Sequence, residues 1–218
     1  MVSGGLRLPR RPDAVLLDLD GTLSDAGPAI GVSVALALEG IGERPLSCEQ
    51  LRSFVGPPLE ISFAALGLSD PVVARAVALY RAHHDQLASP LYEGVLAALQ
   101  ALRGAGLPLA LATSKPQQFA ELVVAGKQLT SFFDVVVGSD REGGRLTKGD
   151  VIASALFALG TPTFPVMVGD RRHDVQGAGE HGVPCIGVLW GYGEPGELEQ
   201  AGAAALAATP VELLHLLT

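Results

Sequence analysis

The stretch Ala14-Val15-Leu16-Leu17-Asp18-Leu19-Asp20-Gly21-Thr22-Leu23 decides the fold of this chain. It begins with a run of apolar residues, typical of a strand buried on both faces of a parallel sheet, and acidic residues follow where that strand ends. Because side chains alternate along a strand, Asp18 and Asp20 should point the same way, into the crevice at the carboxyl end of the sheet. Gly21 then allows the chain to turn sharply away.

The acidic pair at the end of this strand indicates a metal site. Two carboxylates as close as Asp18 and Asp20 are costly to keep ionised unless a cation or a proton holds them. The pair therefore predicts a divalent metal, with one aspartate as nucleophile and the other exchanging protons. A surface turn with an aspartate side chain bonded to its own backbone is the alternative that this stretch alone leaves open.

The composition describes a globular protein with a sizeable core, long enough for one domain or for a domain that carries an insertion. Of the 218 residues, 48% are hydrophobic and 17% are charged, and the net charge is -8. This balance argues against binding to a nucleic-acid polymer, which needs a basic face. A small metal-chelated anion is still compatible with it, because the local charge of a site can oppose the total.

The cysteines and the apolar runs indicate the cellular compartment in which the protein works. Cys48 and Cys185 have neither metal-ligand spacing nor the density of a disulfide scaffold, so we expect two buried thiols in a reducing compartment. Residues 1–12 lack the apolar segment of a signal peptide and should form a loose tail. No apolar run reaches membrane-spanning length. We therefore expect a cytoplasmic protein that does not bind membranes.

A block of helical patterns follows the first strand. It covers about residues 28–40, 47–54, 59–66 and 70–87. No strand pattern occurs between Ser24 and Ser89. Because strands resume only after this block, we interpret residues 23–90 as an inserted all-helical cap domain.

From Tyr92 onward, strand and helix patterns alternate. Strands are expected near residues 107–112, 133–137, 166–168, 185–189 and 203–207. Helices are expected near residues 95–103, 116–125, 151–159, 175–180 and after 209. This alternation predicts an α/β fold with a doubly wound parallel sheet, formed by residues 1–22 and 91–218.

Two later segments supply groups that can bind an anion. An apolar strand runs into Thr113 and Ser114 at a probable helix start, where free backbone N–H groups and a hydroxyl can bind an anion. Simple helix capping is the alternative. Lys148 also stands before a helix, where a cation is electrostatically disfavoured, so a functional role explains it better than a solvated surface position. Its ammonium would offset negative charge on an anion bound nearby.

The segment Val166–Asp174 carries the other acidic signal. A short apolar strand leads into Gly169 and Asp170, and Asp174 follows four residues later. One carboxylate can bind a metal directly, while the other binds through water or orients a ligand. Because Mg²⁺ prefers oxygen ligands, we interpret His173 as a loop residue.

Taken in order, these motifs resemble those of the haloacid dehalogenase-like hydrolases, most of which are magnesium-dependent phosphatases. The resemblance implies a Rossmann-like core and Mg²⁺ as the cofactor. Asp18 would be the nucleophile and Asp20 the general acid and base. Mg²⁺ would be held by Asp18, Asp170, Asp174 and the backbone carbonyl of Asp20. Thr113 would occupy the phosphate-binding position with Ser114 beside it, and which of the two makes the main contact is open.

Asp20 and the helical block narrow the choice within this family. Dehalogenases lack an acid equivalent to Asp20, and phosphonate-cleaving relatives use a cap lysine, whereas residues 24–89 contain none. Sugar phosphomutases usually carry Glu-Asp where this chain has Gly169-Asp170. A receiver-like phospho-acceptor module would be shorter and would lack Asp20, which hydrolyses an acyl phosphate.

Among the phosphatases, two subgroups are similar to this chain. Val55–Leu59 resembles the specificity loop of phosphoglycolate phosphatases, whereas Gly187–Gly193 resembles a 5′-nucleotidase-like subgroup. We expect a phosphoglycolate phosphatase-like enzyme, with a 5′-nucleotidase-like enzyme as the alternative. Gly56 and Arg52 are the cap residues expected at the substrate. The partner would be a small phosphorylated metabolite, and the protein would be a monomer or homodimer.

Overall fold

A parallel sheet forms the centre of the molecule. The computed structural model describes residues 8–84, 89–140 and 143–218. The strands are β1 (Ala14–Leu17), β2 (Leu109–Pro116), β3 (Val135–Ser139), β4 (Pro165–Gly169), β5 (Cys185–Val188) and β6 (Ala205–Ala207). They pair in parallel in the order β3-β2-β1-β4-β5-β6. The predicted doubly wound sheet is therefore confirmed.

The position of β1 in the sheet indicates where a ligand would bind. Its neighbours are β2 on one side and β4 on the other, so the strand order reverses at β1. In sheets of this kind, ligands bind outside the carboxyl ends of the strands at the point of reversal. Asp18, which follows β1, and Asp170, which follows β4, lie at that point.

Helices cover both faces of the sheet. One apolar core joins it to α5 (Val95–Gly104), α6 (Gln117–Gly126) and α10 (Pro210–Leu217), and the other joins it to α7 (Lys148–Ala158), α8 (Arg172–Gly179) and α9 (Glu197–Ala201). The four residues of β1 are buried, with Val15 and Leu17 in one core and Leu16 in the other. This burial on both faces explains the continuous apolar run in the sequence.

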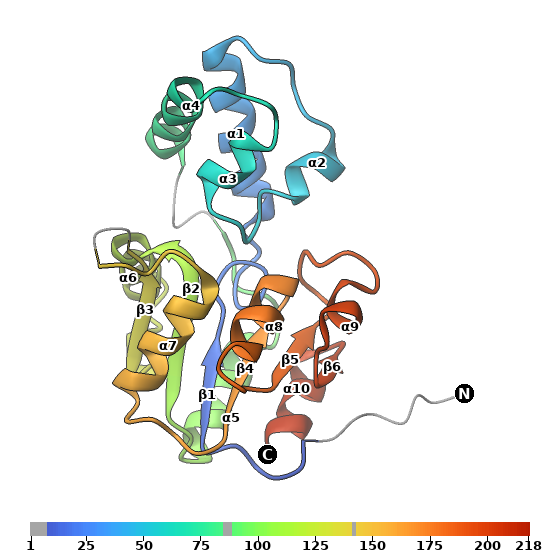
Figure 1. Ribbon diagram of the computed structural model, residues 1–218. Coiled ribbons are helices and arrows are strands. Elements are labelled where there is room, and N and C mark those ends of the chain that lie inside the picture. Colours follow the sequence, from blue (N-terminus) through green and yellow to red (C-terminus); the bar gives the residue numbers. More distant parts are fainter. Residues whose placement is uncertain (1–7, 85–88, 141–142) are drawn as a thin grey trace.

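Four helices form a separate unit between β1 and β2. They are α1 (Gly27–Ile41), α2 (Cys48–Arg52), α3 (Leu59–Ala64) and α4 (Asp70–His83), and Figure 1 shows them beyond the carboxyl ends of the strands. They have their own apolar core, which includes Val34, Phe63 and Tyr80 and is joined by Tyr192 from the sheet-bearing part. The expected end of the last helix near residue 87 lies outside the described residues.

Several local predictions need correction. Strand β2 continues to Pro116, four residues beyond its expected end, so Thr113 and Ser114 lie within the strand and α6 begins at Gln117. The last residues of β2 pair irregularly with β3, where Gly138 allows a close approach to the Lys115 backbone. Helix α8 begins at Arg172, so His173 is helical and not part of a loop. Cys48 is exposed, although Cys185 is buried as expected.

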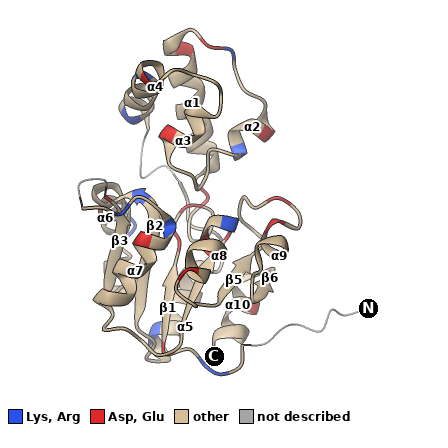
Figure 2. Cartoon of the chain, in the orientation of Figure 1, with Lys and Arg blue, Asp and Glu red and all other residues tan. Residues whose placement is uncertain are grey.

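Two general features of the surface follow from the described residues. Lys and Arg are scattered over the molecule rather than gathered on one element (Figure 2). Within the described ranges, no helix combines the length and the apolar character needed to cross a membrane.

Candidate active site

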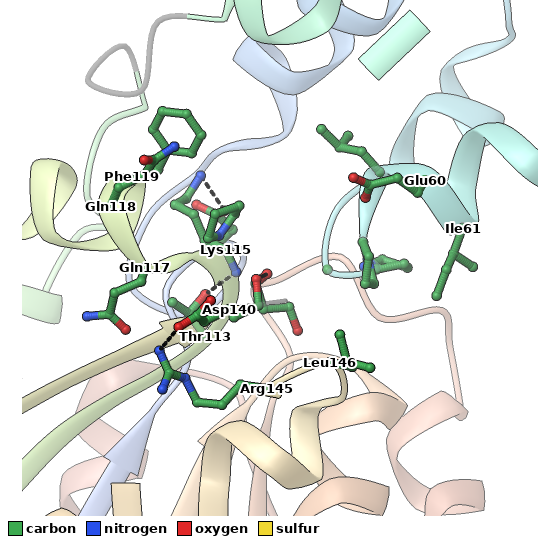
Figure 3. Close-up of a pocket in the computed structure, with 18 of the residues that line it drawn as sticks. Glu60, Ile61, Thr113, Lys115, Gln117, Gln118, Phe119, Asp140, Arg145 and Leu146 are labelled. Atoms are coloured by element: carbon green, nitrogen blue, oxygen red, sulfur yellow. Dashed lines mark hydrogen bonds and ion pairs between the residues drawn. The ribbon is translucent and has the colours of Figure 1, made fainter. Parts of the chain in front are cut away.

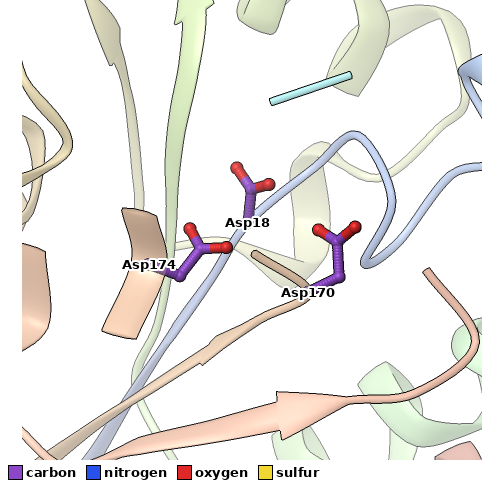
Figure 4. A group of neighbouring side chains, drawn as sticks. All are labelled: Asp18, Asp170 and Asp174. Atoms are coloured by element: carbon purple, nitrogen blue, oxygen red, sulfur yellow. The ribbon is translucent and has the colours of Figure 1, made fainter. Parts of the chain in front are cut away.

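Three aspartates and a lysine converge at the carboxyl edge of the sheet. Asp18 follows β1, Asp170 follows β4, Asp174 lies in the first turn of α8, and Lys148 is the first residue of α7. Their exposed fractions are only 4%, 0%, 1% and 8%, respectively. One oxygen from each aspartate lies within 4.8 Å of the others. Figure 4 shows the three side chains gathered at this edge. Buried charges at this density need compensating partners.

Lys148 supplies part of that compensation. Its Nζ lies 2.7 Å from Asp18 Oδ1 and 2.8 Å from Asp174 Oδ1. It also donates a hydrogen bond to the carbonyl oxygen of Ala112 at 2.9 Å. Because an ammonium has three donors, these contacts satisfy it and fix its position between the two acids.

Asp170 is held by backbone and side-chain donors and by closely packed glycines. The Tyr192 backbone N–H donates to its Oδ2 at 2.7 Å, and the Thr22 hydroxyl donates to its Oδ1 at 3.3 Å. A Cβ on Gly21 would lie 2.2 Å from Asp170 Oδ2, and one on Gly191 would lie 2.3 Å from Asp170 Cβ. The surrounding loops therefore leave room for this carboxylate only because both positions are glycine.

Asp174 is fixed in a similar way. Its Oδ2 accepts the backbone N–H of Arg171 at 3.0 Å, and a Cβ on Gly169 would lie 2.2 Å from its Cγ. Its Oδ1 lies 2.8 Å from Lys148 Nζ, which is the cation that compensates it among the described residues. A buried carboxylate oxygen of this kind suits a metal ion or a metal-bound water.

The electrostatics of the cluster also fit a divalent cation. Burial, with a smaller effect from the charge of Asp174, raises the pKa of Asp18 to about 6 against the opposing effect of Lys148. Burial and the charges of Asp174 and Asp18 also raise the pKa of Asp170. Three carboxylates share one ammonium, and the oxygen-only donor set is what Mg²⁺ prefers.

Asp20 lies beside this cluster and contacts a second lysine. Its Oδ2 lies 2.9 Å from Lys115 Nζ, and its Oδ1 accepts a hydrogen bond from Ser24 at 3.4 Å. Thr113 is buried, and its Oγ1 accepts the backbone N–H of Lys115 at 3.3 Å, whereas Ser114 is half-buried.

A cavity of about 930 Å³ opens above these residues. On the sheet side it is lined by Asp18, Asp20, Thr113, Ser114 and Lys115, and on the side of the helical unit by Phe54, Gly56 to Ile61 and Tyr80. Figure 3 shows Lys115 and Phe119 facing Glu60 and Ile61 across it. Asp170, Asp174 and Lys148 are not among the lining residues. Asp18 is therefore the member of the buried cluster that a ligand in the cavity can reach.

The structure places Arg52, which is expected at the substrate, beside Tyr192. Arg52 does not belong to the described residues that line the cavity, and its Cζ lies 5.5 Å from the centroid of the Tyr192 ring. The cavity arginines are Arg81 and Arg145, which lie 3.2 Å from Glu60 and 3.3 Å from Asp140, respectively. Together with the Lys115–Asp20 pair, these contacts give each lining cation a carboxylate partner.

Sequence reasoning missed the loop that follows β5. Trp190 packs against the core and lies in a turn. In addition, Tyr192 holds Asp170 through its backbone, while its hydroxyl contacts Asp25 and accepts the backbone N–H of Gly27. Trp190 donates to the carbonyl oxygen of Thr22 at 3.0 Å. The glycines on both sides of Tyr192 were the available signal, because they allow the close approach to Asp170.

Comparisons with known proteins agree with this geometry. Residues 15–188 match the family model described as haloacid dehalogenase-like hydrolase. A crystal structure of a predicted phosphatase from Clostridium acetobutylicum is similar with a TM-score of 0.88 and 34% identity, covering 94% of this chain and 98% of that one.

Three of the curated relatives illustrate how their names differ. A tyrosine-protein kinase, PtkA, from Mycobacterium tuberculosis is 36% identical over 94% of this chain and 72% of that protein. A 5′-nucleotidase from Pseudomonas aeruginosa is 35% identical over 91% of this chain and 90% of that protein. A phosphoglycolate phosphatase from Rhodobacter capsulatus is 35% identical over 82% of this chain and 85% of that protein.

Proposed function

This chain belongs to the haloacid dehalogenase-like hydrolases and is a phosphoric monoester hydrolase, and we propose that it uses Mg²⁺ and an aspartyl-phosphate intermediate to hydrolyse a small phosphomonoester. One observation carries the proposal. Asp18 lines the cavity and at the same time belongs to the buried cluster of Lys148, Asp170 and Asp174. A nucleophile in this position can reach a substrate in the cavity, while the buried residues Lys148, Asp170 and Asp174 influence its charge.

The metal would be held by Asp18, Asp170, Asp174 and the backbone carbonyl of Asp20. When bound, Mg²⁺ would neutralise charge on the phosphoryl group and on the attacking carboxylate. The Lys148 ammonium keeps the Asp18 carboxylate oriented and offsets its charge. Thr113, with Ser114 beside it, would donate hydrogen bonds to phosphoryl oxygens.

The reaction would proceed in two displacements at phosphorus. An oxygen of Asp18 forms a bond to phosphorus as the ester P–O bond breaks, and Asp20 gives its proton to the leaving oxygen. Asp20 then accepts a proton from water, whose oxygen attacks the phosphorus of the aspartyl phosphate. This step releases inorganic phosphate and restores the Asp18 carboxylate.

We also propose that residues 23–90 act as a cap on a core formed by residues 1–22 and 91–218. Phe54, Gly56 and Tyr80 come from the helical unit and line the cavity above Asp18 and Asp20. A cap in this position would exclude water and contact the leaving group. Substrate choice would then depend on these residues rather than on the aspartates.

Phosphoglycolate and nucleoside 5′-monophosphates are the two candidate substrates. The Val55–Leu59 loop and the Rhodobacter relative support the first, and the Pseudomonas relative supports the second. The cavity favours the second candidate. Phosphoglycolate has an additional carboxylate that needs a cation, whereas Lys115, Arg81 and Arg145 each contact an acid. A volume of about 930 Å³ also leaves space for a nucleoside.

The test is phosphate release from a panel of esters by the wild type and by Asp18→Asn. The panel should contain phosphoglycolate, nucleoside 5′-monophosphates, a sugar phosphate, pyrophosphate and a phosphotyrosine peptide, the last because of the relative named as a tyrosine kinase. We expect turnover that needs Mg²⁺ and is lost in Asp18→Asn. Absence of turnover together with a stable phosphorylated Asp18 would overturn the proposal and support a phospho-acceptor module.

A further inference from the structure

Arg171 connects the short loop between β4 and α8, which begins with Asp170, to the helical unit. Its Nη1 donates a hydrogen bond to the backbone carbonyl oxygen of Val55 at 2.5 Å, and its Nε lies 2.9 Å from Glu197 Oε1. Arg171 follows Asp170 directly, whereas Val55 lies between α2 and α3. The side chains of Arg171 and Glu197 are only 7% and 6% exposed, so this connection is buried.

Glu197 fixes the direction of the arginine. Its Oε1 also accepts the backbone N–H of Arg172 at 2.8 Å, and its Oε2 accepts the backbone N–H of Glu194 at 3.0 Å. The Arg171 backbone is held by Asp174 and its Nε by Glu197. The guanidinium is therefore preorganised to donate a hydrogen bond to a carbonyl oxygen in one fixed direction.

The carbonyl that it binds belongs to a loop that forms the cavity wall. Val55 is fully buried, and its neighbours Phe54 and Gly56 line the cavity. Gly56 has φ +105°, and a Cβ there would lie 3.3 Å from Arg171 Cγ. We call the segment 53–58 the wall loop. The absence of a side chain at Gly56 allows this loop to pack directly against Arg171.

The contact has the chemistry of a reversible attachment. A hydrogen bond from a charged donor is stronger than a neutral one, yet here it is made to a single carbonyl oxygen that water could also satisfy. When the wall loop leaves, the arginine keeps its partner Glu197. The attachment can thus release the loop without leaving a buried charge unpaired.

We propose that Arg171 is a positioning residue that seats the wall loop over the metal site, with Glu197 as its orienting partner. The wall loop would then contact substrate only while it lies on Arg171, between Asp170 and the helix that carries Asp174. The kinetic part of this inference rests on the proposed phosphatase function. The structural part does not.

The kinetic test compares Arg171→Gln with Arg172→Gln. Arg172 is the adjacent arginine, and its side chain is exposed, so it provides a matched loss of charge. We expect Arg171→Gln to lower kcat/KM for the preferred ester at least about tenfold. Hydrolysis of acetyl phosphate, which is too small to need the wall loop, should change less than about threefold, as should the Mg²⁺ affinity. Arg172→Gln should resemble the wild type in all three measurements.

A distance measurement tests the seating without any turnover. Cys48 is exposed on α2 near the wall loop, and Phe157 on α7 is 80% exposed, so spin labels on Cys48 and on Phe157→Cys report the separation of the two parts. We expect a narrow distance distribution in the wild type and in Arg172→Gln. In Arg171→Gln the distribution should broaden or shift to longer distances.

Two conservative variants decide the matter if Arg171→Gln fails to fold. Arg171→Lys lacks the fork that contacts Glu197 and Val55 together, and Glu197→Gln removes the orienting charge, so both should broaden the distances and lower kcat/KM. Wild-type distances and wild-type kcat/KM in the folded Arg171 variants would overturn the inference. A further outcome is a wild type that shows no turnover while the distances between the spin labels still change in the Arg171 variants. This result would refute the phosphatase proposal and support the role of Arg171 in seating the wall loop.

Discussion

Lys148 Nζ lies 2.7 Å from Asp18 Oδ1, beneath the cavity floor. The lysine opens helix α7, where the helix dipole opposes a cation, so its position depends on the carboxylates of Asp18 and Asp174. These acids also determine its protonation. Burial lowers the pKa of Lys148, but the two negative charges outweigh burial and raise that pKa above its ordinary value. The lysine is therefore a cation at neutral pH.

Replacement of this cation should separate catalysis from metal binding. Lys148→Met removes the charge that offsets the phosphoryl group, and we expect kcat to fall by about 10²- to 10³-fold, as for other preorganised electrostatic groups. Mg²⁺ should bind at least as tightly, because three carboxylates then lack their ammonium. Steady-state kinetics and calorimetric titration would measure the two effects. Lys127→Met is the control, since Lys127 contacts the Ser89 carbonyl oxygen outside the cavity. Equal loss of kcat in both variants would contradict this role.

Gly21 should be essential for the metal site for a steric reason. It has φ +94°, and a Cβ would lie 2.2 Å from Asp170 Oδ2, so Gly21→Ala must displace the carboxylate. We expect this variant to lose the increase in Tm that Mg²⁺ produces. Gly42→Ala is the matched control, because Gly42 has φ +82° with no described atom within 4 Å of the added Cβ. Both variants carry a backbone cost of about 1–3 kcal/mol, but Gly42→Ala should keep its response to Mg²⁺.

The phosphate contact should belong mainly to Thr113. Its Oγ1 accepts the Lys115 N–H, which orients the hydroxyl so that its hydrogen can be donated to a phosphoryl oxygen. Loss of one hydrogen bond to a charged group corresponds to about 1.5–3 kcal/mol, or roughly 10- to 100-fold in kcat/KM. Thr113→Val should show this loss and Ser114→Ala a smaller one, measured on the preferred ester. The opposite order would assign the contact to Ser114.

The fold and the acidic cluster were accessible from the sequence for the same reason. Apolar runs that end in acids predict strand ends, and the carboxyl ends of parallel strands share one edge, so Asp18 and Asp170 could be expected to meet. Lys148 could be added because its place at a helix start has no favourable local explanation. None of these inferences required the exact length of an element.

Contacts between the two parts of the chain were not accessible in this way. Arg171 reaches Val55, and Tyr192 reaches Asp25, across more than a hundred residues of sequence. Both contacts depend on how the helical unit lies on the sheet, and no periodicity encodes that arrangement. The position of Arg52 outside the described cavity lining has the same origin, since its distance from Gly56 along the chain did not reveal which way its helix faces.

The stability of the metal-free protein should fall as the pH rises from 5 to 7.5. Burial raises the pKa of Asp18 from 3.8 to about 6, so this carboxyl favours folding fully below its unfolded pKa, and the contribution is lost as the pH passes the folded value. A shift of about two pKa units corresponds to roughly 3 kcal/mol over the whole titration, of which about half is lost between pH 5 and 7.5, and Asp170 acts in the same direction. Glu197 acts oppositely. Burial raises the pKa of Glu197, but the N–H groups of Arg172 and Glu194 and the charge of Arg171 outweigh burial and lower this pKa below its ordinary value. The stability that Glu197 contributes is therefore lost only as the pH falls below about 4.5.

Thermal unfolding in EDTA and in millimolar Mg²⁺ at both pH values would measure this effect. In EDTA we expect Tm to be lower by several degrees at pH 7.5 than at pH 5. Mg²⁺ should restore more stability at pH 7.5, because it binds the ionised carboxylates. Asp18→Asn cannot ionise, so it should unfold at a higher temperature than the wild type in EDTA at pH 7.5 and show a weaker pH dependence. If the wild type in EDTA had the same Tm at both pH values, burial of these carboxylates would not be the dominant charge effect in the cluster.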